Sequence, residues 1–507
     1  MEANKAESRS LAAASIDAVR TDPWKALDLA IQADEASATP EATDALRRAL
    51  EAPRERAVLE LRNERIWSAN FTADSRHVLT QSRTLDTLVW NVRRWNLATG
   101  EPELARTHRS PPAEPSPADV SPDGTLRISA RQPGVRLSDA ATGTPLIELD
   151  RLGPGLEGGY RAAEFSPDGR SFLTAGYDRT ARVWPLTLRR LPTKGVVASA
   201  ISPDGQRCLT VNSDATVTWW ACANGEGLRS WTLPKPEAGD ALISGQAVAS
   251  FGPNGPRLVV FDGSTTTVWN AENGVELLRL RGPPDLSSPP SVSPSASLAL
   301  RALSDQAAEI VQMPGESRVS TLPVDLRSST VTVPAAFSED DRRVAIHSYD
   351  EPLVRVWDTA TGRELAKVRP LEGEFGDLAL SRDGSLLLTA SGTSAELWDV
   401  ASGRRLRSFP AQDPVFKAAF SADERFIVTR GADGRARVWE TSTGRPVAVH
   451  VAGGIGAARL GENGRLLASG GGSAVVFDCP ACQPSTELLA EARAELEERP
   501  AGSSSGS

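Results

Sequence analysis

Short apolar stretches alternate with polar turns along most of this chain, and the alternation has a fixed period. A turn of the form Ser-Pro-Asp-Gly is followed by an apolar stretch, and a Trp stands about 17 residues after the turn. The clearest copy begins at Phe165, has its turn at residues 166–169 and ends at Trp184. Ten such copies lie between residues 70 and 478, and they predict ten similar structural units.

The Trp position is the most constant part of the repeat. Seven of the ten copies keep the indole, and Ser138, Val311 and Phe477 occupy the other three positions. A second turn, such as Thr361-Gly362, comes four residues later. The seven indoles belong to Trp95, Trp184, Trp220, Trp269, Trp357, Trp398 and Trp439.

The residues of each repeat predict four short antiparallel strands. Pro presets φ in the turn, Asp bonds to the local backbone, and Gly accepts the left-handed conformation, so each hairpin closes in one register. One small sheet cannot bury both of its faces. Neighbouring sheets must therefore stack radially with the Trp side chains between them, as in an all-β propeller.

The repeats resemble WD repeats, with the signature dipeptide kept at Trp357-Asp358 and Trp398-Asp399. The resemblance covers residues 56–478 and implies a propeller of WD-like blades. The Gly-His dipeptide of the family is absent, since the histidines are His77, His108, His347 and His450. The family's hydrogen-bonded tetrad therefore cannot form, and we expect each blade to be held mainly by packing.

Ring closure is predicted from the two ends of the repeat region, residues 54–484. The last repeat stops after its third strand, at residues 474–478, and a lone strand-like segment at residues 56–62 precedes the first repeat. We expect this segment to complete the final blade. Ten units exceed the seven or eight usual for the family, so one large ring and an uneven arrangement both remain open.

Helices are predicted on both sides of the repeats. Residues 1–53 carry three amphipathic segments, two of which begin at Asp22-Pro23 and Thr39-Pro40. Their apolar stripes could pack on each other, on the side of the propeller or on a preceding domain, and a simple cap over a sheet edge is the bland alternative. Residues 485–499 predict a C-terminal helix, and residues 500–507 a flexible tail.

The helical segment and its junction with the repeats are similar to bacterial signalling ATPases of the STAND class. The similarity rests on residues 8–14, 22–27 and 40–50, and on the C-x-x-C at Cys479 and Cys482 followed by a helix. It implies a sensor region that a P-loop ATPase would precede. No G-x-x-x-x-G-K-[ST] motif occurs here, so the chain would be the sensor part alone.

Composition favours a soluble protein without nucleic-acid or membrane partners. The net charge is −9, and no apolar run approaches the ~20 residues of a membrane span. Four cysteines in 507 residues do not suggest a disulfide framework, and no secretory signal is evident, so a cytoplasmic location is the default. Cys479 and Cys482 could form a local disulfide, stay as thiols or join a zinc site that needs two more ligands.

No catalytic constellation is apparent, because the histidines are scattered and most recurring carboxylates belong to turns. We therefore expect no enzyme, no cofactor and no metal site. Partner contacts should come from the loops between blades and from the turns between second and third strands; packing between blades is the alternative role for Trp67 and Phe416. The candidates are Arg65, Trp67, Tyr160, Arg161, Tyr177, Arg179, Asp350, Phe375, Phe416 and Asp433.

The leading hypothesis is a non-catalytic recognition module of a bacterial signalling or defence-type system. Its partner would be a protein, such as a signalling ATPase or an effector, with a small molecule as the alternative ligand. A second hypothesis is a constitutive scaffold for complex assembly. A third, a propeller hydrolase, would need a cleft with perturbed carboxylates.

Overall fold

A computed structural model describes most of the chain, and it divides into two bodies. The first body comprises residues 1–190 with 478–507, and the second comprises residues 191–477. The described residues are 2–19, 22–52, 57–60, 64–84, 90–97, 99, 101–108, 118–130, 135–140, 143, 145–149, 160–176, 180–186, 188–193, 195–234, 247–252, 255–261, 265–281, 291–295, 297–304, 307–313, 317–324, 335–348, 353–371, 373–451, 458–470, 473–482 and 485–497.

The first body carries the described helices, which begin where the sequence provides caps. Asp22 accepts the backbone N–H of Lys25 at 2.9 Å, and Thr39 accepts that of Ala42 at 3.2 Å, each before a Pro in the first turn. No described helix is long and apolar enough to cross a bilayer. The helices are α1 (Glu2–Ala18), α2 (Pro23–Ala36), α3 (Pro40–Glu51), the 3₁₀ turn η1 (Pro480–Cys482) and α4 (Ser485–Glu497).

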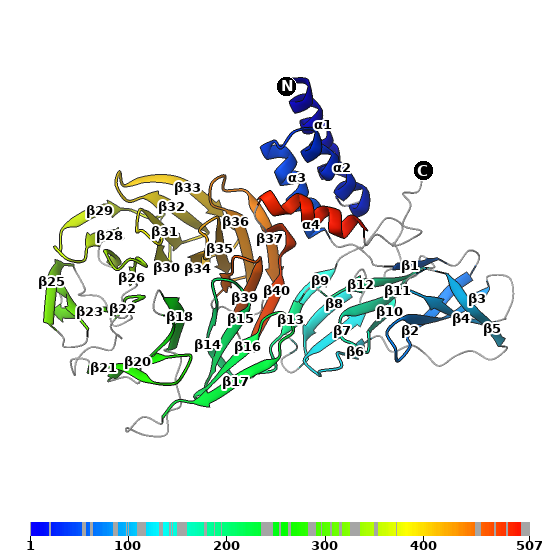
Figure 1. Ribbon diagram of the computed structural model, residues 1–507, viewed down its shortest axis with the longest axis horizontal. Helices are drawn as coiled ribbons and strands as arrows, with labels where there is room; N and C mark the ends of the chain where they lie inside the picture. Colours follow the sequence, from blue (N-terminus) through cyan, green and yellow to red (C-terminus); the bar gives the residue numbers. More distant parts are fainter. Residues whose placement is uncertain are drawn as a thin grey trace. The chain divides into compact units, whose positions relative to one another are not determined.

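The N-terminal helices pack on each other and on the C-terminal segment. α1, α2 and α3 are mutual neighbours, and α4 lies against α2 and α3 (Figure 1). Arg47 of α3, which is buried, donates to the carbonyl of Ala481 at 2.5 Å. Arg493 of α4 forms an ion pair with Glu35 of α2 at 2.5 Å. Of the packing alternatives, the structure therefore shows helix-on-helix contact.

The same body holds three four-stranded sheets, and β1 belongs to one of them. β1 pairs antiparallel with β12, with Leu59 opposite Ala181. Our prediction that this segment completes the final blade is therefore wrong, because it completes the third blade instead. The sheets are β2 (Glu64–Phe71), β3 (His77–Thr84), β4 (Trp90–Asn96), β5 (Pro102–His108); β6 (Ala118–Val120), β7 (Leu126–Ala130), β8 (Val135–Asp139), β9 (Pro145–Leu149); and β1 (Ala57–Glu60), β12 (Thr180–Pro185), β11 (Ser171–Gly176), β10 (Tyr160–Phe165).

The second body contains six complete blades in chain order. Each runs from its first to its fourth strand as an antiparallel meander (Figure 1). They are β14 (Val196–Ile201), β15 (Arg207–Asn212), β16 (Thr216–Ala221), β17 (Gly227–Thr232); β18 (Ala247–Gly252), β19 (Gly255–Phe261), β20 (Thr265–Asn270), β21 (Glu276–Arg281); β22 (Ser291–Val292), β23 (Leu298–Ser304), β24 (Ala307–Gln312), β25 (Ser317–Pro323); β26 (Ala335–Phe337), β27 (Arg343–Ser348), β28 (Leu353–Asp358), β29 (Glu364–Val368); β30 (Phe375–Leu380), β31 (Leu386–Ser391), β32 (Ser394–Asp399), β33 (Arg404–Pro410); and β34 (Val415–Phe420), β35 (Phe426–Gly431), β36 (Arg435–Glu440), β37 (Pro446–Val451).

A seventh blade closes this set. It contains β38 (Ala458–Leu460), β39 (Arg465–Gly470) and β40 (Ser473–Asp478). The remaining strand, β13 (Leu188–Arg190), belongs to the first body. The last and first blades are neighbours, since β14 lies against β38 and β39, and the hydroxyls of Ser199 and Ser469 are 2.8 Å apart. The predicted all-β propeller is confirmed.

The turns form as their residues predict. In the clearest copy, Ser166 donates its hydroxyl to the Asp168 carboxylate at 2.6 Å, and Gly169 has a φ of +67°. A side chain at that φ would be strained, so glycine fits the position.

Hydrogen bonds from the Trp side chains act beside the packing that we expect to be the main stabilisation of the blades. All seven recurrent Trp side chains are buried, and five of their indole N–H groups donate to a Thr hydroxyl on the second strand of the same blade. The pairs are Trp95–Thr80, Trp184–Thr174, Trp220–Thr210, Trp398–Thr389 and Trp439–Thr429, at 2.8–3.0 Å. These five Trp–Thr hydrogen bonds therefore form although the Gly-His dipeptide is absent.

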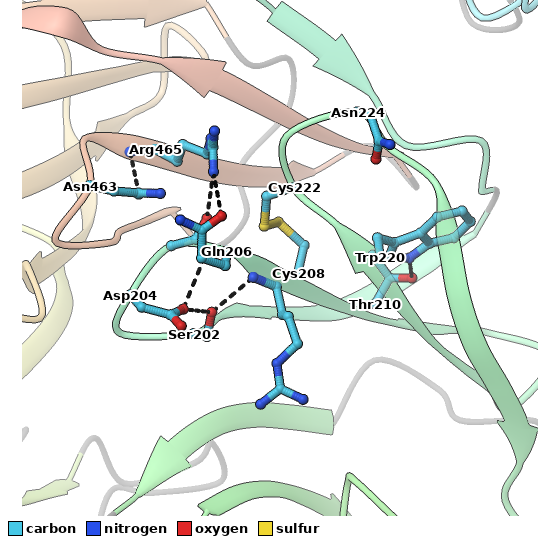
Figure 2. Close-up of a disulfide and its surroundings, with 12 residues drawn as sticks. Ser202, Asp204, Gln206, Cys208, Thr210, Trp220, Cys222, Asn224, Asn463 and Arg465 are labelled. Carbon is cyan, nitrogen blue, oxygen red and sulfur yellow. Dashed lines mark hydrogen bonds between the residues drawn. A yellow bond between two sulfur atoms is a disulfide. The ribbon is translucent and has the colours of Figure 1, made fainter.

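All four cysteines are paired, and the Cys208–Cys222 bond was not expected. Cys208 on β15 is bonded to Cys222, just after β16, with a Cα–Cα distance of 5.4 Å (Figure 2). Cys479 and Cys482 form the second disulfide, across η1. The zinc alternative for this pair is not seen, since each sulfur bonds to the other.

Candidate functional site

The structure places four of the ten predicted contact residues. Tyr160 lies in the first body and is buried, so its side chain packs inside rather than on a surface. Phe375, Phe416 and Asp433 lie in the second body, on the neighbouring blades β30–β33 and β34–β37. The side chains of Arg65, Trp67 and Arg161 and all of Tyr177, Arg179 and Asp350 lie outside the described residues.

Phe375 packs between two blades. Its ring stacks on the imidazole of His347 from β27, with centroids 3.7 Å apart and planes 7° from parallel. His347 is buried, and this burial lowers its pKa to about 4. Phe375 therefore contributes to packing between blades.

Phe416 lies beside a very close approach of two inner strands. A Cβ added to Gly376 on β30 would stand 2.6 Å from the Cα of Phe416 on β34, closer than real Cβ contacts allow. Glycine is thus required for β30 and β34 to sit at this distance. The Phe416 side chain itself is half-buried and keeps part of its ring in contact with solvent.

Three charged side chains gather on the first strands of three consecutive blades, and we call them the inner-strand cluster. They are Asp377 on β30, Lys417 on β34 and Arg459 on β38. The Lys417 ammonium lies 3.7 Å from the Asp377 carboxylate. Arg459 keeps exposed surface, yet burial among surrounding atoms lowers its pKa against the opposing attraction of Asp377. Water therefore reaches a guanidinium that is largely surrounded by protein.

Asp377 also has a structural role that the sequence reading missed. Burial raises its pKa, while Lys417, Arg459 and backbone N–H groups including that of Ala418 act in the opposite direction. Ala418 is on the next blade, so the carboxylate links β30 to β34. The Asp119 carboxylate on β6 likewise accepts a hydrogen bond from the backbone N–H of Phe165 on β10, at 2.9 Å, and so links two blades. An acidic residue in the first strand of a repeat is the signal that would have found these links.

Asp433 is occupied within its own turn. Its carboxylate accepts from Arg437 at 2.5 Å and 3.2 Å and from the backbone N–H of Arg435 at 3.1 Å. Burial would raise its pKa, but the bonds from Arg437 and Arg435 outweigh burial and lower it. Asp433 therefore shapes the turn between the second and third strands, and its charge is neutralised there.

The described side chains contain no group of three or more His, Cys, Asp or Glu arranged to hold a metal ion. The site instead offers two cations, one carboxylate engaged between blades and a partly exposed aromatic ring. Such a set can bind charged and apolar groups of another molecule.

Comparison with known families identifies part of the chain directly. The model described as WD domain, G-beta repeat matches residues 157–185 and 403–440. Both segments match as WD repeats. The first segment lies in the first body, across β10, β11 and β12 of one blade. The second lies in the second body and runs from β33, the last strand of one blade, through β34, β35 and β36 of the next. WD repeats indicate a protein-interaction or scaffold module rather than a catalytic one.

One curated relative also shows similarity. It is eukaryotic translation initiation factor 3 subunit I of Culex quinquefasciatus, which is 34% identical over 99 residues. The match covers 19% of this chain and 30% of the relative. The chain thus spans less than a third of the length of that relative.

Proposed function

We propose that this chain is a non-catalytic protein-recognition module whose second body binds a partner at the first-strand ends of β30, β34 and β38. The observation that carries the proposal is the inner-strand cluster beside Phe416. Arginines next to aromatic rings are common hot spots of protein interfaces. Lys417 and Arg459 both keep surface for a partner to reach.

We propose further that the helices of the first body couple recognition to a signalling partner, an ATPase or an effector, as in bacterial STAND-class sensors. The bonds from Arg47 to Ala481 and from Arg493 to Glu35 support a coupling role, since they join the N-terminal helices to the C-terminal segment. A cytoplasmic location stays a prediction. The two disulfides weigh against it, because structural disulfides persist mainly in oxidising compartments.

A constitutive scaffold is the second candidate, and the curated relative favours it. By its name that protein is a subunit of a larger factor. A scaffold would hold the same partner at all times, whereas a sensor would gain or lose its partner with a stimulus.

The test is capture of partners by the full chain from lysates of stimulated and unstimulated source cells, quantified by mass spectrometry. Phe416→Ala should deplete the partner. Leu406→Ala should retain it, because Leu406 is 49% exposed on the outer strand β33, away from the first strands. If the two variants recover the partner equally, recognition does not use this surface. Stimulus dependence would select the sensor, and constant recovery the scaffold.

A further inference from the structure

We infer that Lys417 and Arg459 bind a carboxylate group from an acidic segment of the protein partner. This inference rests on the proposed function and names the chemistry of the partner. It uses the inner-strand cluster, whose three residues come from three consecutive first strands.

The charge balance of the cluster favours an anion. Two cations face one carboxylate, and Asp377 is already shared between the Lys417 ammonium and the backbone N–H of Ala418. The nearby Asp433 is paired with Arg437 and adds no free negative charge. The cluster therefore carries an uncompensated positive charge.

Arg459 has unused donors. Among the described residues its guanidinium makes one hydrogen bond, to the carbonyl of Ala458 at 3.0 Å, and no carboxylate lies within ion-pair distance. A guanidinium has five N–H donors in a planar fork, which matches the two oxygens of a carboxylate. Because the group is partly desolvated, a charge brought to it interacts more strongly than it would at an open surface.

A polypeptide fits this surface better than a small free anion, because an aromatic residue adjoins Lys417 in the chain. Phe416 precedes Lys417 on β34, at the register shift between Val415 and Lys417, and it is half-buried. An acidic peptide can place a carboxylate on the cations and an aliphatic stem on this ring. A phosphate ion would interact with the two cations alone.

The experiment measures binding of fluorescein-labelled hexaglutamate to the full chain by fluorescence anisotropy, with hexaglutamine as the neutral counterpart. Hexaglutamate should bind and hexaglutamine should not. Arg459→Gln should weaken binding about tenfold, as expected for loss of a charge-assisted hydrogen-bonded pair. Arg459→Lys should fall between, since it keeps the charge but not the fork.

Arg342→Gln is the matched control, because Arg342 is 83% exposed in a turn. The inference is overturned if Arg342→Gln weakens hexaglutamate binding as much as Arg459→Gln does. It is also overturned if Arg459→Gln leaves both the binding and the melting temperature unchanged. Inorganic phosphate could also be added as a competitor of labelled hexaglutamate. Competition as strong as that by unlabelled glutamate oligomers would overturn the choice of a peptide. If hexaglutamate fails while Phe416→Ala still depletes the captured partner, the proposed function stands and only the acidic chemistry falls.

Discussion

The indole nitrogen of Trp439 donates a hydrogen bond to the hydroxyl of Thr429 at 2.9 Å, joining the third strand of its blade to the second. The register explains why this bond recurs. Trp439 stands opposite Ile427 on β35, and Thr429 is two residues further along the same face of that strand. The same offset holds for Trp95, where Val78 is the opposite residue and Thr80 the acceptor.

Thr429→Val should destabilise the chain by about 1–3 kcal/mol, because the isosteric side chain leaves a buried indole N–H without its acceptor. Thr429→Ser keeps the hydroxyl and should cost less. Urea denaturation measures both free energies of unfolding. If the valine and serine variants unfold at the same urea concentration, the hydrogen bond does not contribute.

The blade of Trp357 offers the reverse experiment. There the register puts Ile346 at the acceptor position, and the buried indole N–H has no hydrogen-bond partner among the described residues. Ile346→Thr should therefore be about as stable as Ile346→Val, whose loss of one methylene costs about 0.5–1.5 kcal/mol. A threonine without a partner would be worse than valine by a further ~1–3 kcal/mol. Such a deficit in urea denaturation would show that the indole N–H does not donate to the new hydroxyl.

The repeat and its strands were predictable because they are local. A turn at residues 166–169 and a Trp at 184 lie within one repeat, and their spacing predicts hairpins without knowledge of distant contacts. Which blade a strand completes was not predictable in this way. β1 could in principle pair with the last blade or with β12, and the choice depends on contacts between residues over 100 positions apart. The Cys208–Cys222 bond is local, with a sequence separation of 14, and it was missed because the sequence does not give the exact strand register that brings the two side chains together.

Gly376→Ala tests the close approach of β30 and β34. The new methyl group would lie 2.6–2.9 Å from backbone atoms of Phe416, which cannot swing aside as a side chain can. We expect a loss of about 1–3 kcal/mol in the free energy of unfolding, typical of overpacking. Gly227→Ala is the control, because its nearest neighbour is Trp220 at an ordinary 3.7 Å. Equal melting temperatures for the two variants would contradict the geometry.

The candidate site was only partly predictable from residue type. Phe375 and Phe416 are both half-buried, but they differ by one position in their strands, since Phe375 corresponds to Val415 and Phe416 to Gly376. The stack of Phe375 on His347 joins two blades, and a single repeat contains no information on such a contact. The inner-strand cluster is harder still, since Asp377, Lys417 and Arg459 each look like an isolated surface charge in the sequence.

Burial of His347 makes stability depend on pH. Its pKa falls from an ordinary 6.5 to about 4 in the folded chain, so between these values the unfolded chain binds more protons. Stability should therefore fall as the pH drops from about 6.5 towards 4, by at most about 3 kcal/mol, and this contribution should level off below 4. Urea midpoints at a series of pH values measure the slope. His347→Gln cannot titrate, so the difference between wild type and variant isolates this residue from the carboxylates. A difference that stays constant from pH 7 to 4 would mean that the folded chain accepts the proton, and that the stack on Phe375 does not require the neutral imidazole.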